Sequence, residues 1–257
     1  MKIITLNTWG GRAGSKKIID FLKTHKNNID IFCLQEIWSS PHKDLDGYNA
    51  GGLPIDHGNI MVNGKQDISR LLEKHHSFFC PHFGDNYGLL MMYKKDLKIV
   101  DKGELFVHKE KGYIPEGDLG NHARNIQYIT FEDAGRLNTV INFHGLWNGK
   151  GKIDSEDRIT QSKNILKFIN SLSRDVIFCG DFNLLPNTKS LLMFEESGLT
   201  NLVRKYRVKS TRTSYYKKSE KFADYILISK DIKVKDFRVL PDEVSDHAPL
   251  YLEYTQR

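Results

Sequence analysis

Cysteine and long hydrophobic runs are both scarce in this sequence. None of its three cysteines has the C-x-x-C spacing of a metal site, and Cys33 and Cys179 lie inside apolar runs, as small core residues do. No apolar stretch approaches the ~20 residues of a membrane-spanning helix. The N-terminal MKIITLNTWGG has too short an apolar stretch for a secretory signal. We therefore expect a cytoplasmic protein without a transmembrane segment.

Positive charge is in excess, but in one segment only. The 257 residues carry a net charge of +6, and residues 204–221 hold eight Lys or Arg and one Glu, which accounts for the whole excess. Tyrosines alternate with these cations, so one interpretation is a segment that grips the backbone of nucleic acid. The alternative is a solvated loop. The length suits one domain over residues 1–257, and nothing indicates an obligate protein partner.

Short apolar runs predict a strand-rich α/β fold. We expect strands at 2–7, 30–35, 88–94, 104–108, 124–132, 138–144, 175–180, 224–229, 234–240 and 249–254. Helical periodicity is clearest after Asp154 and Ser155, either of which would be the N-cap, and in residues 15–25. The runs DISRLLEKHH and NTKSLLMFEES are shorter helix candidates, and 47–65 is expected to be a surface loop. The order of elements favours mixed sheets with helices on their outer faces.

Polar side chains stand where these runs begin or end. Four runs end on Asn7, Glu36, His144 and Asp181, whereas Asp224 and the pair Asp246-His247 precede late strands. In antiparallel pairing the end of one strand lies beside the start of its neighbour. Mixed pairing would therefore bring all of these groups to one rim.

Six sequence blocks also resemble a known superfamily. LNTW, LQEIW, NFHG, GDFN, FADYIL and SDHAP occur in the order found in the endonuclease/exonuclease/phosphatase superfamily, and they span the chain from Asn7 to Pro249. The resemblance implies a four-layer α/β sandwich, with two mixed β-sheets face to face and helices outside. It also implies a metal-dependent phosphoesterase that uses Mg²⁺, with Mn²⁺ as a substitute.

The resemblance assigns a role to each polar residue. Glu36 would be the first metal ligand, rather than a helix or turn cap, and Asp246 the second. Asn7 would support this site through its amide oxygen or contact the phosphate. Asp181 would orient and deprotonate the attacking water, and Asn183 would donate to a phosphate oxygen or the nucleophile.

The two histidines of the rim would complete the catalytic set. His144 and His247 can each reach a phosphate, and Asp224 would orient one of them. His57 and His122 are the next histidines to consider. A loose alignment offers Asp85 as an acid paired with a catalytic histidine.

Four further residues are candidates for substrate binding. The nuclease branch often has a phosphate-binding arginine where Arg124 starts a strand; the alternative is a structural salt bridge. Trp9, Trp38 and Trp147 each follow a proposed site residue closely. At least one would stack on a base, or all would be apolar plugs.

The sequence thus predicts a Mg²⁺-dependent phosphodiesterase, with a nuclease or nucleotide-directed hydrolase as the first choice. A phosphatase or a phospholipase C-like enzyme is the alternative, since it needs the same chemistry. A catalytically inactive binding module is disfavoured, because pure binding does not require all of these polar groups together.

Overall fold

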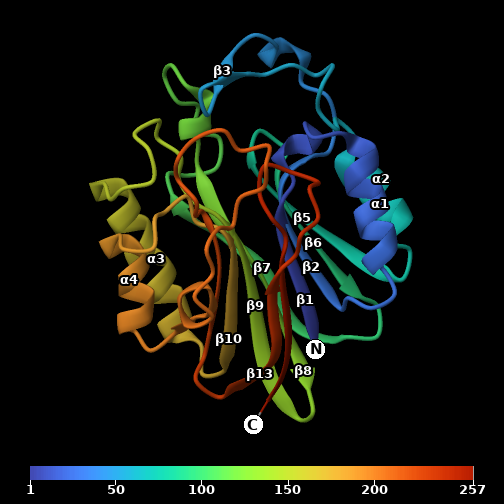
Figure 1. Cartoon of the computed structure of the whole chain (residues 1–257), viewed down its shortest axis with the longest axis vertical. Helices are drawn as coiled ribbons and strands as arrows, with labels where there is room; N and C mark the ends of the chain where they lie inside the picture. The colour runs from blue at the N-terminus through green and yellow to red at the C-terminus, as the bar shows by residue number, and fades with distance from the viewer. Residues whose placement is uncertain (257) are drawn as a thin grey trace.

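Two six-stranded sheets form the centre of the protein (Figure 1). The computed structural model describes residues 1–256. The first sheet has the order β13 (Ile232–Val239), β14 (Leu250–Gln256), β1 (Lys2–Asn7), β2 (Ile31–Trp38), β6 (Tyr87–Lys94) and β5 (His75–Phe83). The second has the order β11 (Thr200–Asn201), β12 (Asp224–Ile228), β10 (Asp175–Asp181), β9 (Arg136–His144), β8 (Arg124–Asp133) and β7 (Lys98–His108).

Each central strand is buried on both faces, which explains its nearly continuous apolar sequence. In β1, Ile3 packs into the core between the sheets, whereas Ile4 and Leu6 pack beneath the helices of the first sheet. β2 alternates in the same way, with Cys33 between the sheets and Phe32 beneath the helices. The period of two along each strand thus builds two apolar layers from one run.

Helices cover the outer faces and complete four layers. α1 (Ser15–His25) and α2 (Gly64–Leu71) cover the first sheet, and α3 (Glu156–Ser171) and α4 (Lys189–Glu196) cover the second (Figure 1). A short α5 (Leu202–Lys205) follows β11. Ser155 is the N-cap of α3 and accepts a hydrogen bond from the backbone N–H of Arg158. The predicted four-layer sandwich is confirmed. Within residues 1–256, no helix has the length and hydrophobicity that crossing a bilayer requires.

Mixed pairing gathers the polar strand ends at one edge, as expected. β10 runs antiparallel to β12 and parallel to β9, so Asp181 pairs with Asp224 on one side and with His144 on the other. The backbones of β10 and β9 approach each other closely here. A Cβ on Gly180, whose φ is +138°, would lie 2.0 Å from the carbonyl oxygen of Phe143. In the first sheet, β1 is parallel to β2 and antiparallel to β14.

Two local predictions were wrong. His75 and His76 do not end a helix, because α2 ends at Leu71 and β5 begins at His75. Tertiary pairing with β6 overrides the helical pattern of that short run. Glu36 does not end its strand either: β2 continues to Trp38, and the ladder with β6 is irregular between Leu34 and Ile37. Glu36 has a φ of +60°, which such an irregularity allows.

The segment between β2 and α2 lies over the upper edge of both sheets (Figure 1). We call residues 39–63 the roof. It contains the turn η2 (Lys43–Leu45) and the two-residue strands β3 (Asn49–Ala50) and β4 (Leu53–Pro54), so the expected loop carries a small hairpin. The turns η1 (Trp9–Gly11) and η3 (Leu119–Asn121) flank this edge.

Candidate active site

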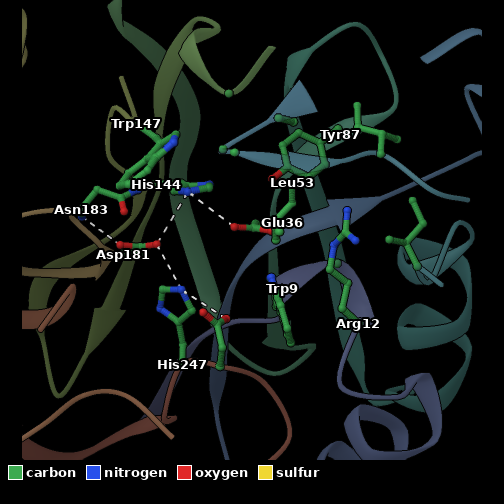
Figure 2. A pocket seen from close by; sticks show the side chains of 18 of the residues that line it. Trp9, Arg12, Glu36, Leu53, Tyr87, His144, Trp147, Asp181, Asn183 and His247 are labelled. Atoms are coloured by element: carbon green, nitrogen blue, oxygen red, sulfur yellow. Dashed lines mark hydrogen bonds and ion pairs between the residues drawn. The ribbon is translucent and has the colours of Figure 1, made fainter. Parts of the chain in front are cut away.

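A pocket of about 440 Å³ opens at the edge where the polar strand ends meet. Ten of the twelve predicted site residues line it: Trp9, Glu36, Trp38, Arg124, His144, Trp147, Asp181, Asn183, Asp246 and His247. Figure 2 shows Glu36, His144, Asp181 and His247 among them. The other two, Asn7 and Asp224, lie behind this wall and are hydrogen-bonded to it. The structure therefore brings the whole predicted set together from both sheets.

Asp181 lies at the bottom of this pocket and is 1% exposed. The side-chain amide of Asn7 donates to Asp181 Oδ2 and to Glu36 Oε1, at 2.9 Å each. Asn7 Oδ1 accepts from the backbone N–H of Trp9, so this oxygen is occupied, and the NH₂ group joins the two carboxylates instead. Asn183 donates from its backbone N–H to Asp181 Oδ1 at 2.8 Å and from its side chain to the Gly145 carbonyl. Asn7 and Asn183 thus fix the orientation of Asp181.

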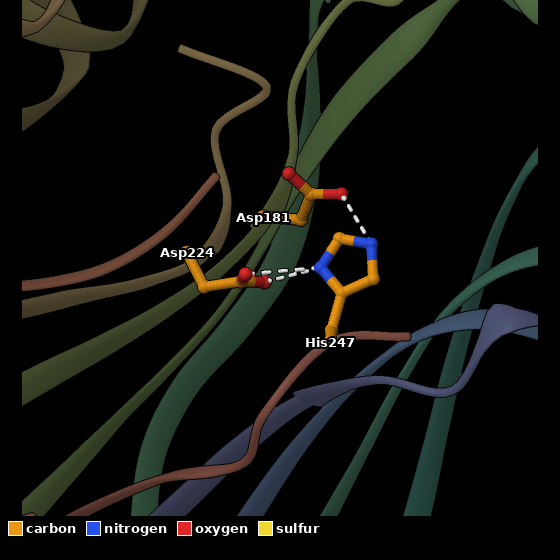
Figure 3. Close-up of side chains that lie close together, drawn as sticks. All are labelled: Asp181, Asp224 and His247. Atoms are coloured by element: carbon orange, nitrogen blue, oxygen red, sulfur yellow. Dashed lines mark hydrogen bonds and ion pairs between the residues drawn. The ribbon is translucent and has the colours of Figure 1, made fainter. Parts of the chain in front are cut away.

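Two imidazoles face the same carboxylate oxygen. Nε2 of His144 and Nε2 of His247 each lie 3.7 Å from Asp181 Oδ2. Nδ1 of His247 lies 2.8 and 2.9 Å from the two oxygens of Asp224, which is the orienting contact that the sequence predicted (Figure 3). Burial, with the charge of Arg212, lowers the pKa of His247 to about 4. Burial raises the pKa of Asp224 to about 6, so at neutral pH a neutral ring donates to an ionised carboxylate.

Three of the residues that line the pocket, Glu36, Asp181 and Asp246, carry carboxylates that suit a cation. Burial, together with the charges of Asp246 and Asp181, raises the pKa of Glu36 to about 7, although the Asn7 hydrogen bond opposes this. Asp246 Oδ2 accepts from Arg212 Nη1 at 2.9 Å, whereas its Oδ1 is buried without a hydrogen-bond partner. Mg²⁺ prefers carboxylate oxygens and retains several waters. Glu36 and the free oxygen of Asp246 therefore suit such an ion.

A second group of potential ligands is Asp181, Asp224 and His247, whose ligand atoms lie within 4.8 Å of one another. Both oxygens of Asp224 already accept from His247, and this arrangement typically orients a catalytic ring. The donor chemistry thus favours Glu36 with Asp246 for a hard cation.

A cationic group also lines the pocket. Arg124 is 2% exposed, and its Nη2 donates to the Gly120 carbonyl at 2.8 Å. Its Nε and Nη1 are buried without partners, so Arg124 makes no salt bridge among the described residues. An unpaired buried guanidinium is costly, and an anion in the pocket would satisfy it.

Histidines surround this arginine, and the sequence reading missed one of them. The ring of His82 contacts that of His122 in a tilted arrangement, at 4.8 Å between centroids, and lies 5.8 Å from that of His144. Burial, reinforced by the charge of Arg124, lowers the pKa of all three rings well below the ordinary value. They are neutral at pH 7 and leave Arg124 as the cation of this group. His82 belongs to β5, a strand that the sequence analysis did not predict.

The remaining histidine and acid candidates have other roles. His57 is within the roof, where its ring contacts Asp46 and accepts from the backbone N–H of His42. Asp85 lies in the turn before β6, and its side chain is 86% exposed, outside the pocket lining. The loose alignment of Asp85 with a catalytic acid therefore has no support in the geometry.

The three tryptophans differ in exposure although all line the pocket. Trp38 is 7% exposed and packs against Tyr87 at 5.0 Å between ring centroids, which fits the apolar plug. Trp9 and Trp147 are half-buried. The ammonium of Lys218 lies 5.4 Å from the centroid of the Trp147 ring, and the two form a cation–π contact beside the pocket.

The basic segment 204–221 divides into two parts. Arg204 pairs with Glu195 on the outer side, whereas Arg212 and residues 215–218 line the pocket. Arg212 is also the partner of Asp246, a pairing that the sequence analysis missed. Lys152 was missed too: it is 2% exposed, lines the pocket and lies 4.8 Å from the Tyr216 ring centroid. Lys152 follows Gly149 and Gly151 in a loop, and no local sequence pattern indicates that it belongs to a site.

Comparisons with known proteins agree with this fold. Residues 4–247 match the Endonuclease/Exonuclease/phosphatase family. The fold resembles mannosyl-6-phosphatase of Bacteroides thetaiotaomicron (18% identity, 99% of each chain covered, TM-score 0.74). It also resembles a family protein of Leptotrichia buccalis (21%, 99% of each chain, TM-score 0.72). The human Nocturnin catalytic domain with bound sulfate is similar as well (17%, 100% of this chain and 94% of that one, TM-score 0.66).

No curated protein matches the chain in sequence. The structural neighbours share too little identity to transfer an activity, but they confirm the sandwich fold. The family match covers most of the chain, and the residues at the pocket come from its matched part. The chain therefore belongs to the endonuclease/exonuclease/phosphatase family, whose members are hydrolases of phosphate esters.

Proposed function

We propose that the protein is a Mg²⁺-dependent phosphodiesterase that uses an activated water for in-line attack. One observation carries this proposal: Asp181 is buried, oriented by Asn7 and Asn183, and faced by two imidazoles at 3.7 Å. A carboxylate held in this way is suited to positioning a water and accepting its proton. A structural role alone would not require so many polar groups around one buried acid.

Each side of the pocket has its own task in this proposal. Arg124 binds the phosphate with its two unpartnered nitrogens, and His144 lies between that anion and Asp181. His247, held by Asp224, presents Nε2 to the phosphate, and a negatively charged substrate beside it favours the protonated ring. Glu36 and Asp246 would hold Mg²⁺, which when bound neutralises phosphate charge and lowers the pKa of water.

A nucleotide or nucleic acid is the first substrate class that we propose. The half-buried Trp9 and Trp147 offer ring faces for a base, and Lys217 and Lys218 line the pocket beside them. The second candidate is a phosphatase acting on a small phosphate ester. The fold similarity to mannosyl-6-phosphatase supports this alternative, since the same residues would serve both reactions.

Hydrolysis of bis-p-nitrophenyl phosphate tests the reaction class. We expect activity with Mg²⁺ or Mn²⁺ that EDTA abolishes, and a loss of about 10³-fold in kcat in Asp181→Asn. Asp96→Asn, at an exposed position away from the pocket, is the matched control. Full activity of a folded Asp181→Asn protein would contradict the proposal. A panel of DNA, RNA, sphingomyelin and phosphate monoesters separates the two substrate classes.

A further inference from the structure

The roof is attached to the first sheet at its base. The guanidinium of Arg12, in the loop after β1, donates from Nη1 to Asn59 Oδ1 and from Nη2 to the Pro54 carbonyl, at 3.2 Å each. The backbone N–H of Met61 donates to the Gly10 carbonyl at 2.7 Å. These contacts hold one side of the roof at the edge where β1 and β2 end.

The tip of the roof is attached to the second sheet. The backbone N–H groups of Gly51 and Gly52 donate to the two carboxylate oxygens of Asp118, at 2.7 and 2.9 Å. Asp118 belongs to the loop before β8, and it also accepts from the N–H of Gly120 at 2.7 Å. The roof therefore crosses from the first sheet to the second and is bonded on both sides (Figure 1).

The contact at the tip leaves no gap. A Cβ on Gly120 would lie 2.6 Å from the backbone nitrogen of Gly51 and 3.0 Å from Cδ1 of Trp147. A Cβ on Gly51, whose φ is +67°, would lie 3.5 Å from Trp147 Nε1. Two backbone segments thus touch beside the Nε1–Cδ1 edge of the Trp147 indole, an approach that glycine makes available.

The groups proposed to act on phosphate line the pocket that the roof borders. Asp181, Arg124, His144 and His247 are each at most 4% exposed, and the roof residues Leu53 and Ile55 line the same pocket. A volume of about 440 Å³ is in the range of pockets that enclose one small ligand. A phosphate in the middle of a polymer would have to bring its neighbours on both sides into this space.

We infer that the roof restricts this enzyme to small phosphate esters and to the ends of longer chains. This inference rests on the proposed function and adds the substrate geometry to it. A covalently closed polymer has no end to insert beneath a bridge that is bonded on both sides. Internal phosphodiesters of a circle should therefore not reach Asp181 while Asp118 holds the roof.

A linear and a circular single-stranded DNA of the same sequence test this inference. We expect the linear strand to be degraded from an end and the circle to be cut at least about tenfold more slowly. Hydrolysis of a nucleoside p-nitrophenyl phosphate without cleavage of either strand would support it as well. Equal rates of cleavage for circle and linear strand would overturn it.

Opening the roof gives a second, independent readout. Asp118→Ala removes the acceptor for Gly51 and Gly52, and we expect it to accelerate cleavage of the circle roughly tenfold. Its activity on bis-p-nitrophenyl phosphate should remain, because Asp118 does not line the pocket. Asp85→Ala, which removes an exposed carboxylate paired with Lys111 and leaves the contact of Asp118 in place, is the matched control. A circle that stays as resistant in Asp118→Ala as in the wild type would contradict the role of the roof.

Binding separates this inference from the proposed function. If no ester is hydrolysed, the proposed function fails, but access to the pocket is still measurable by tryptophan emission. Thymidine 5′-monophosphate should change the emission of the wild-type protein, and the circular strand should not. An equal change with the circle would overturn the inference whether or not the protein has activity.

Discussion

Nδ1 of His247 lies 2.8 and 2.9 Å from the two carboxylate oxygens of Asp224, and both side chains are buried. The contact turns Nε2 of His247 toward Asp181 Oδ2 at 3.7 Å and Asp246 Oδ1 at 3.6 Å. Asp224 begins β12, beside the end of β10, so pairing of the two strands creates this arrangement. The pair can therefore be tested as a unit.

We predict that Asp224→Asn and His247→Gln are strongly non-additive. Each should lower kcat for bis-p-nitrophenyl phosphate by about 10²-fold or more, because Asp224 acts through the ring of His247. The double variant should lose little beyond the worse single variant. Kinetics of all four proteins complete the cycle, and additive losses would show that the two residues act independently.

Arg124 and Arg158 provide a matched pair of buried arginines. Arg124 has two unpartnered nitrogens, whereas Arg158 donates to the carbonyls of Leu146 and Ile153 through all three of its nitrogens. Arg124→Met should stabilise the protein by ~1 kcal/mol or more, because it removes an uncompensated buried charge. Arg158→Met should destabilise it by ~2–4 kcal/mol, because several hydrogen bonds are lost.

The same variant should also impair substrate binding. Arg124→Met is expected to raise KM for phosphate diesters about tenfold or more, since a charge-assisted contact to phosphate is lost. Urea unfolding and steady-state kinetics measure the two effects separately. A destabilised Arg124→Met protein with an unchanged KM would indicate a structural arginine instead of a phosphate ligand.

Glu36→Gln should separate stability from metal binding. The neighbouring charges of Glu36, Asp181 and Asp246 repel one another, so removing one should raise Tm in EDTA. In the wild type, Mg²⁺ at 100 times its Kd should stabilise by about 2.7 kcal/mol, and this gain should vanish in the variant. Thermal unfolding with and without Mg²⁺ measures both. The same Mg²⁺-dependent shift in both proteins would exclude Glu36 as a ligand.

His75 should make the protein sensitive to acid. Its ring is 5% exposed, Nε2 is 3.0 Å from the Ile29 carbonyl, and burial lowers its pKa below the ordinary 6.5. The unfolded chain therefore takes up this proton at a higher pH than the folded chain does. The corresponding stability is complete above about pH 6.5 and is lost as pH falls toward the folded pKa.

Replacing the imidazole of His75 should weaken the dependence of stability on pH. His75→Gln can still donate to the Ile29 carbonyl but takes up no proton, so its free energy of unfolding should fall less between about pH 8 and pH 5. His76→Gln, at the exposed neighbouring position, is the control. Urea unfolding across this range decides the matter, and identical pH profiles for wild type and His75→Gln would exclude His75 as the cause.

Most of the strands can be predicted from the sequence because each is marked by a local run of apolar residues. In residues 175–181, for example, the buried positions from Val176 to Cys179 are all apolar, and Gly180 and Asp181 mark the end of the run. The order of the polar blocks around Asn7, Asp181 and His247 was sufficient to predict a common rim. β5 was missed because its residues, with His76 and Ser77 exposed, have no such apolar run, and pairing with β6 holds it in place.

The partners within the rim depended on the tertiary structure. Asn7 joins two carboxylates through its NH₂ group, and Arg212 neutralises Asp246, although 174 residues separate Asn7 from Asp181 and 34 separate Arg212 from Asp246. Residue type and spacing do not specify such contacts, because they depend on which strand ends become neighbours and on where side chains point once packed.

The roof also has one feature that the sequence determines and one that depends on the tertiary structure. The sequence by itself determined a polar, glycine-rich loop after β2, because turn residues act locally. Only the tertiary structure decided that its tip meets Asp118, across the cleft and 66 residues away. That contact requires both sheets to be assembled first, since its two sides are attached to different sheets.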